Sequence, residues 1–274
     1  GITVSTTDTL TSVSIKLRNK ELPKYDFNKI NIYHALDSFS YKVRLVYPDT
    51  LIYREENFED GITSIILNEY TDSIKLEFRK TSAIQNRFEL YGFSLETNDP
   101  GVIYHAIGVN GAETASYLRC NLFESHLKAL HPDLIIVSLG TNDAYPKYFN
   151  PKVFEENYNA LILNLKNVYP EIPLLLTVPG DSYRFRKYLN EDLLKVRNII
   201  FELAMKHNSS VWDFYSVMGG QNAIYLWHKN NLAGSDRLHF TKEGYILQGD
   251  LMFNAFLKKY DEYIENDKLD SLTE

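Results

Sequence analysis

Asp236 and His239 are the residues of this 274-residue chain whose types and spacing most clearly predict chemistry. They lie in Asp-Arg-Leu-His-Phe at 236–240, where, on a loop before a helix, the carboxylate can accept a hydrogen bond from Nδ1 of the imidazole. That contact would fix the ring tautomer and leave Nε2 free to act as a base. The pair therefore predicts the base and the orienting acid of a nucleophilic hydrolysis site. The alternative is a surface Asp–His pair.

Two further stretches could stabilise an oxyanion. Gly111, in Gly-Val-Asn-Gly-Ala at 108–112, follows an apolar run and opens a helical pattern, so its backbone N–H would face a bound ligand. Asn142, in Gly-Thr-Asn-Asp at 140–143, follows a buried strand pattern, and its amide could donate to developing negative charge. The alternatives are a helix-packing glycine and a turn asparagine that caps its own backbone. Asp143 is interpreted as a residue that orients the turn.

The elements that must position these stretches fall into two patterns. Residues 1–97 contain short runs rich in Val, Ile, Tyr and Phe, separated by turn residues, and predict an all-β domain of the sandwich or jelly-roll type. The predicted strands are 10–17, 29–35, 41–47, 62–67, 73–78 and 87–96. Asn-Asp-Pro-Gly at 98–101 marks the boundary and gives predicted domains 1–98 and 99–274.

Beyond residue 101, strand and helix patterns alternate. The predicted strands are 102–109, 134–139, 173–178 and 211–214, and the predicted helices are 113–130, 151–169, 191–207 and 242–263. This alternation predicts an α/β fold with a parallel sheet and right-handed crossovers. Ligands of such sheets bind beyond the carboxyl ends of the strands, and the stretches that contain Gly111, Asn142 and His239 fall there.

Composition excludes several classes of function. The net charge is −7 and basic runs are missing, which argues against nucleic acid as a partner. No apolar run approaches the roughly 18 residues of a membrane span. The single cysteine, Cys120, excludes an intrachain disulfide, and the six other histidines show no metal-ligand spacing. The sequence starts at Gly1 rather than Met, which suggests a processed or trimmed protein.

The three stretches together resemble a known family. Asn-Gly-Ala around Gly111, Gly-Thr-Asn-Asp around Asn142, and Asp-x-x-His are similar, in chain order, to the second, third and fifth sequence blocks of the SGNH (GDSL-type) serine hydrolases. The resemblance covers about residues 100–264. The segment 1–97 resembles the carbohydrate-module-like β-sandwich that members similar to peptidoglycan and polysaccharide O-acetylesterases insert between the first and second blocks.

The resemblance implies a three-layer α/β/α hydrolase domain and removal of an acetyl group from a carbohydrate through an acyl-enzyme. By this resemblance His239 is the general base and Asp236 its orienter, Gly111 N–H and Asn142 Nδ2 are the oxyanion donors, and neither a cofactor nor a metal is involved. It also favours an exported protein. Two alternatives stay open. One is a carbohydrate-binding protein on a degenerate hydrolase scaffold, and the other is a lipase or thioesterase, although the chain shows nothing similar to a long apolar lid.

The family's first block, a Gly-Asp-Ser turn after the first strand, is missing from the start of this chain. Gly-Asp-Ser at 180–182 follows a later strand, and because neighbouring strands are about 4.8 Å apart, Ser182 would lie too far from His239. Asp181 and Ser182 are therefore interpreted as residues of the site rim or as helix-capping residues. Ser38 is followed by a strand pattern where a helix is required, and Ser271 lies in a polar tail.

The sequence therefore predicts a nucleophilic serine upstream of Gly1. The upstream segment would include a central strand of the parallel sheet. We expect the resulting gap to be filled by that segment, by a neighbouring chain or by a rearranged strand.

Overall fold

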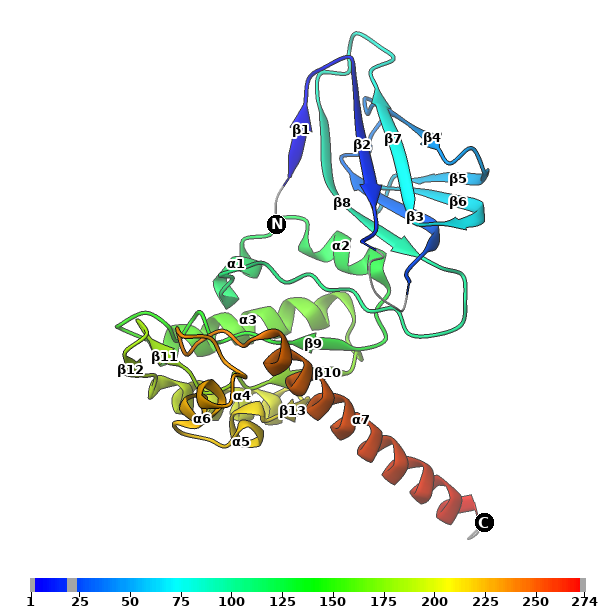
Figure 1. Ribbon diagram of the computed structural model, residues 1–274. Coiled ribbons are helices and arrows are strands. Elements are labelled where there is room, and N and C mark those ends of the chain that lie inside the picture. Colours follow the sequence, from blue (N-terminus) through cyan, green and yellow to red (C-terminus); the bar gives the residue numbers. More distant parts are fainter. Residues whose placement is uncertain (1–2, 19–23, 272–274) are drawn as a thin grey trace. The chain divides into compact units, whose positions relative to one another are not determined.

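The structure, a computed structural model, describes the backbone of residues 3–18 and 24–271 and the side chains up to residue 266. The chain divides into two compact units (Figure 1). The β unit comprises Gly1–Val109 and Cys120–His131, and the α/β unit comprises Asn110–Arg119 and Pro132–Glu274. The predicted boundary at residue 98 differs from this division, because residues 99–109 and 120–131 group with the β unit.

The β unit contains two antiparallel sheets. The first has the order β1 (Val4–Thr6), β8 (Phe88–Glu96), β3 (Phe27–His34), β6 (Ile62–Thr71) and β5 (Leu51–Asn57). The second has the order β2 (Leu10–Lys16), β7 (Ser73–Arg79) and β4 (Lys42–Tyr47). Six strands lie where the alternating patterns predict them. β1 and β5 were not predicted, because β1 is three residues long and every side chain of β5 is exposed, which removes the alternation.

One hydrophobic core joins the two sheets of the β unit. Along β7 every second side chain is buried, and Ile74, Leu76 and Phe78 contribute to the core. Phe78 stacks on Phe88 of the other sheet with ring centroids 4.3 Å apart. This period of two is the reason why the sequence reveals these strands: alternate side chains point to opposite faces of a sheet.

The predicted strand at 102–109 is wrong: the structure gives these residues no regular secondary structure. Their apolar side chains are exposed, Val102 at 96% and Tyr104 at 81%. An apolar run predicts an extended segment, but a β-strand also requires an adjacent strand in register, which the run itself does not specify.

The α/β unit is built on a parallel sheet with the order β13 (Ser210–Trp212), β10 (Leu174–Thr177) and β9 (Ile135–Val137). All four side chains of β10, the middle strand, are buried, which explains why its sequence is continuously apolar. The strands run in the same direction, so the loops after β9, β10 and β13 all leave from the carboxyl ends of the strands. The 138–143 and 178–182 segments therefore lie at the same end of the sheet.

The helices of the α/β unit follow the predicted pattern only in part. They are α1 (Thr114–Leu118), α3 (Pro151–Val168), α4 (Asp192–Lys206), α5 (Phe214–Met218), α6 (Ala223–Lys229) and α7 (Lys242–Ser271). The predicted helix at 113–130 is instead two helices, α1 and, in the β unit, α2 (Phe123–Leu130), because the chain passes between the units there. The short helices α5 and α6 and the hairpin of β11 (Tyr183–Arg184) and β12 (Tyr188–Leu189) were not predicted.

The local sequence sets the start of α3. Asn150 accepts hydrogen bonds from the backbone of Lys152 and Val153, and Pro151 occupies the first turn, as predicted for the start of α3.

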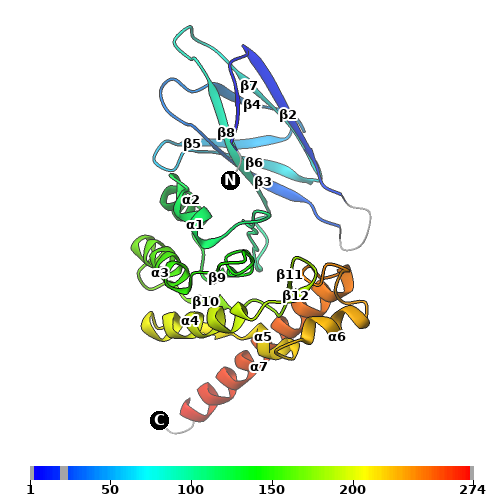
Figure 2. The same ribbon diagram turned by 90° about the vertical axis from the view of Figure 1, so that its left-hand side faces the viewer.

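The last half of α7 extends away from the rest of the α/β unit in both views (Figures 1 and 2). None of the described helices is both long and apolar enough to cross a membrane.

Candidate active site

The loop before α7 holds Asp236 and His239 in direct contact. Nδ1 of His239 lies 2.7 Å from Oδ2 of Asp236, and the other carboxylate oxygen accepts the backbone N–H groups of Leu238 and His239 at 3.0 and 3.1 Å. The His239 side chain is 63% exposed, so the edge of the ring that does not contact Asp236 is accessible. The contact leaves Nε2 as the nitrogen that can exchange a proton with a reactant.

The charge of Asp236 is favoured at this position. Partial burial by itself raises the pKa of the carboxyl, but the hydrogen bonds from the His239 ring and from the Leu238 and His239 backbone outweigh burial and hold the pKa below its usual value. A carboxylate that stays ionised can orient the imidazole and stabilise the imidazolium.

The backbone fixes the shape of this loop. Gly234 N–H donates to the carbonyl of His239 at 2.8 Å, and Arg237 N–H donates to the carbonyl of Gly234 at 3.0 Å. Ala233 and Phe240 form a bridge that closes the loop, and Arg237 adopts a left-handed φ of 53°. The Asp–His contact is thus held by a closed turn.

The loop after β9 places Asn142 beside the turn that contains Gly111 and Ala112. Nδ2 of Asn142 donates to the carbonyl of Ala112 at 2.9 Å. Asp143 accepts both the N–H and the hydroxyl of Thr114, at 3.0 and 2.6 Å, at the start of α1. The structure therefore brings the Asn142 loop and the turn at 111–112 together. The Asn142 amide has a second N–H that this contact does not use.

Gly111 lies at the turn that precedes α1 and is exposed, with φ of +75°. A Cβ added there would meet nothing within 4 Å, so the left-handed backbone is what favours glycine at this position. Its predicted role as an oxyanion donor stays a prediction.

Asp181 and Ser182 follow β10 but point into the protein, because each is 2% exposed. Oδ2 of Asp181 accepts the N–H of Ile224 in the first turn of α6 at 3.1 Å, as expected of a residue that caps a helix. Burial raises the pKa of Asp181 to about 6, although backbone hydrogen bonds oppose the shift. Neither side chain lines an exposed rim, and the burial of Ser182 gives no support to a nucleophilic role.

The β11–β12 hairpin connects two of these loops, and sequence reasoning missed it. The Tyr183 backbone N–H donates to the carbonyl of Arg237 at 2.8 Å, and the Arg184 side chain donates to the carbonyl of Ala144. Phe185 and Arg186, the central residues of its turn, have φ of 52° and 62°, as in type I′ turns. Such turns are recognised from Asn and Gly, which this turn does not contain, so the sequence offered no signal.

The sequence model of the GDSL-like lipase/acylhydrolase family matches residues 81–247, more than half of the chain. The chain belongs to this family. It is therefore an ester hydrolase with an SGNH-like α/β fold, as its sequence resemblance predicted. No protein of curated function matches the sequence.

Several solved structures are similar to this GDSL-family protein. A peptidoglycan O-acetylesterase is 15% identical, with 93% of this chain and 77% of that chain covered and a TM-score of 0.63, which shows a shared fold. A lipase/acylhydrolase from Enterococcus faecalis is 22% identical over 54% of this chain and 72% of its own, with a TM-score of 0.43. An acetyl xylan esterase is 25% identical over 54% of this chain and 78% of its own, with a TM-score of 0.43.

Proposed function

We propose that this GDSL-family protein removes acetyl groups from a carbohydrate through an acyl-enzyme intermediate, with His239 as the general base. The observation that carries the proposal is the 2.7 Å contact between Asp236 Oδ2 and His239 Nδ1 on an imidazole that is 63% exposed. An orienting carboxylate and an accessible Nε2 are the arrangement that activates a serine hydroxyl.

The proposed reaction has two steps. The serine Oγ attacks the acetyl carbonyl as His239 Nε2 takes its proton, and the Gly111 N–H and the second Asn142 N–H stabilise the oxyanion. The tetrahedral intermediate collapses, the C–O bond to the sugar breaks, and His239 returns the proton to the leaving alkoxide. Water then attacks the acyl-enzyme by the same route and releases acetate.

We propose that the nucleophilic serine is supplied by a segment upstream of Gly1. The sheet topology supports this location. β9 forms the edge of the described parallel sheet and pairs only with β10 there, so a further strand can be added beside it.

The peptidoglycan O-acetylesterase that shares this fold is named for the substrate class that we adopt. Under this proposal the antiparallel sheets of the β unit form the sandwich expected of such enzymes, and the α/β unit with its upstream strand completes a three-layer domain. A non-catalytic glycan-binding protein would bind the same polysaccharides without turnover. A lipase or thioesterase would prefer long acyl chains.

The test compares the 274-residue chain with a longer polypeptide that includes upstream sequence. We expect a fluorophosphonate probe to label an upstream serine of the longer polypeptide, and only the longer polypeptide to release acetate from acetylated glycans. His239→Ala should lower turnover by at least about 10³-fold. His207→Gln is the control, because His207 lies in the same unit and contacts Asn159 instead.

Three results would contradict the proposal. An adduct at Ser182 or Ser38 that disappears in His239→Ala would place the nucleophile inside this chain. Glycan binding without labelling or turnover would establish the binding protein. Faster hydrolysis of long-chain than of acetyl esters would establish a lipase.

A further inference from the structure

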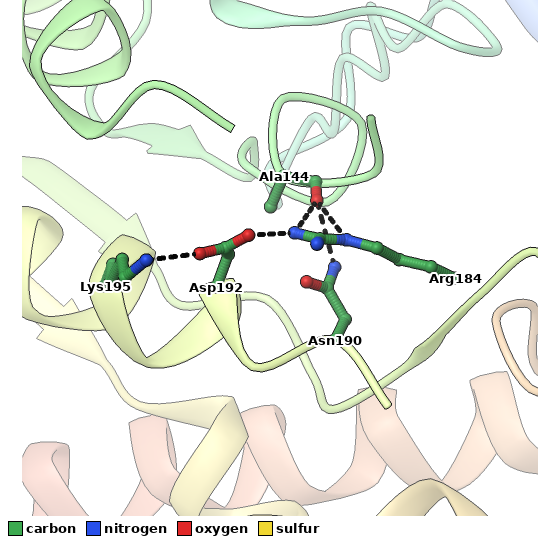
Figure 3. Close-up of polar contacts among 5 residues, drawn as sticks. All are labelled: Ala144, Arg184, Asn190, Asp192 and Lys195. Atoms are coloured by element: carbon green, nitrogen blue, oxygen red, sulfur yellow. Dashed lines mark hydrogen bonds and ion pairs between the residues drawn. The ribbon is translucent and has the colours of Figure 1, made fainter. Parts of the chain in front are cut away.

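The loop that carries Asn142 is held by an arginine from the β11–β12 hairpin (Figure 3). The carbonyl of Ala144, two residues after Asn142, accepts hydrogen bonds from Arg184 Nε at 3.0 Å and Arg184 Nη2 at 2.7 Å. Asn190 Nδ2 donates a third at 3.2 Å. Ala144 is fully buried, so these side chains supply the partners that water cannot supply to its carbonyl.

The guanidinium of Arg184 is itself held in place. Arg184 forms an ion pair with Asp192, and Lys195 contacts the other oxygen of Asp192 at 2.7 Å (Figure 3). Burial raises the pKa of Asp192, but the hydrogen bonds from Lys195 and Arg184 outweigh burial and lower it below its usual value. The Arg184 and Asp192 side chains are 14% and 15% exposed, so separating them would leave two largely buried charges unpaired.

The carbonyl of Ala144 belongs to the same turn as Asn142. Ala144 N–H donates to the carbonyl of Gly140 at 3.0 Å, and Tyr145 N–H donates to the carbonyl of Asn142 at 3.2 Å. A group that fixes the Ala144 carbonyl therefore fixes the backbone from which the Asn142 amide extends. Displacements of about 1 Å at such a donor are enough to weaken catalysis.

The same strand also contacts the loop of the catalytic pair. The Tyr183 N–H donates to the carbonyl of Arg237, between Asp236 and His239, at 2.8 Å. The Arg237 guanidinium lies 5.0 Å from the centroid of the Tyr183 ring. Two consecutive residues of β11 thus hold the Asn142 loop and the Asp236–His239 loop.

We propose that Arg184 is a positioning residue for ester hydrolysis. Its hydrogen bonds to the Ala144 carbonyl keep the Asn142 amide where the oxyanion forms. The N–H of the neighbouring Tyr183 connects the same hairpin to the loop of His239. This inference rests on the proposed function of Asn142 and His239.

The test uses the 274-residue chain and does not require turnover. The side-chain amide signal of Asn142 is assigned in a ¹H–¹⁵N NMR spectrum by its loss in Asn142→Asp. Arg184→Met, which keeps the length of the side chain but removes its donors, should shift or broaden this signal. The Ala144 and Tyr145 backbone amides should exchange with deuterium roughly tenfold faster. Arg184→Lys, which retains the charge and can donate to the carbonyl, should give a smaller shift.

Arg197→Met is the matched control. Arg197 Nη2 lies 2.8 Å from Oδ2 of Asp213, the N-cap residue of α5, so Arg197 also forms an ion pair but not with the loop of Asn142. The proposal is overturned if the Asn142 signal is unchanged in Arg184→Met, or if Arg197→Met moves it equally. Should Arg184→Met fail to fold, Asp192→Ala, which removes the carboxylate that holds the Arg184 guanidinium, decides by the same two criteria.

The proposed function has its own separate readout. In the polypeptide that carries the nucleophile, Asn142→Ala should lower kcat for p-nitrophenyl acetate by about 10²-fold or more with little change in KM. An unchanged kcat would refute the oxyanion role of Asn142, whatever the NMR result. Loss of kcat in Asn142→Ala together with an unmoved signal in Arg184→Met would refute only the positioning role.

Discussion

Replacing Gly140 by alanine should destabilise the α/β unit and disturb the loop that carries Asn142. A Cβ at Gly140 would lie 2.9 Å from Val196 Cγ1 and 3.0 Å from Pro179 Cγ. Overpacking of this kind costs about 1–3 kcal/mol. The φ of +119° is a further penalty for any side chain, about 1–3 kcal/mol. We therefore expect Gly140→Ala to lower the free energy of unfolding by about 2–6 kcal/mol.

The assay is urea unfolding followed by tryptophan fluorescence. The chain has two tryptophans, Trp212 and Trp227, and both lie in the α/β unit, so the signal reports the unit that contains Gly140. Gly249→Ala is the control. Gly249 is an exposed residue inside α7 with nothing within 4 Å of an added Cβ, so the same substitution should stabilise the helix by about 0.5–1 kcal/mol. Equal midpoints for Gly140→Ala and the parent would refute this reasoning.

Three further predictions concern stability. The pKa of Asp181 rises from an ordinary 3.8 to about 6, so its contribution to stability is fully present below pH 3.8 and is lost as pH rises through 6. The parent should therefore lose up to about 3 kcal/mol relative to Asp181→Asn between pH 3.5 and 7, and parallel pH profiles would contradict this. Asn150→Ala should cost about 1 kcal/mol in urea unfolding because it removes the α3 cap, and no loss would show that the cap is redundant. Phe214→Ala should cost about 3–5 kcal/mol, whereas Phe253→Ala should cost little, since the side chains are 1% and 61% exposed; equal effects would contradict the packing.

Sequence reasoning succeeded where a contact or a pattern is local. Asp236 and His239 are three residues apart, so one turn brings them together, and their spacing predicts the contact that the structure shows. The buried run of β10 and the Asn150–Pro151 start of α3 are similarly local. The family assignment came from such short stretches and their order along the chain.

Contacts between distant parts of the chain could not be predicted. Asn142 and Ala112 are 30 residues apart, and Arg184 and Ala144 are 40 residues apart. The residues around one member of such a pair do not specify the other member. The two meet only when the packing of the fold brings their loops together. The predicted strand at 102–109 was wrong for a related reason: an apolar run does not specify which other strand it would pair with.

The sequence by itself therefore determined the hydrolase family, most of the strands and helices, and the Asp236–His239 pair, since propensity, periodicity and turn chemistry act within a few residues. Only the tertiary structure decided that Asp181 and Ser182 are buried and that β11 lies against two loops of the site. Burial and long-range hydrogen bonding are properties of packed elements, because each depends on which surfaces exclude water from one another.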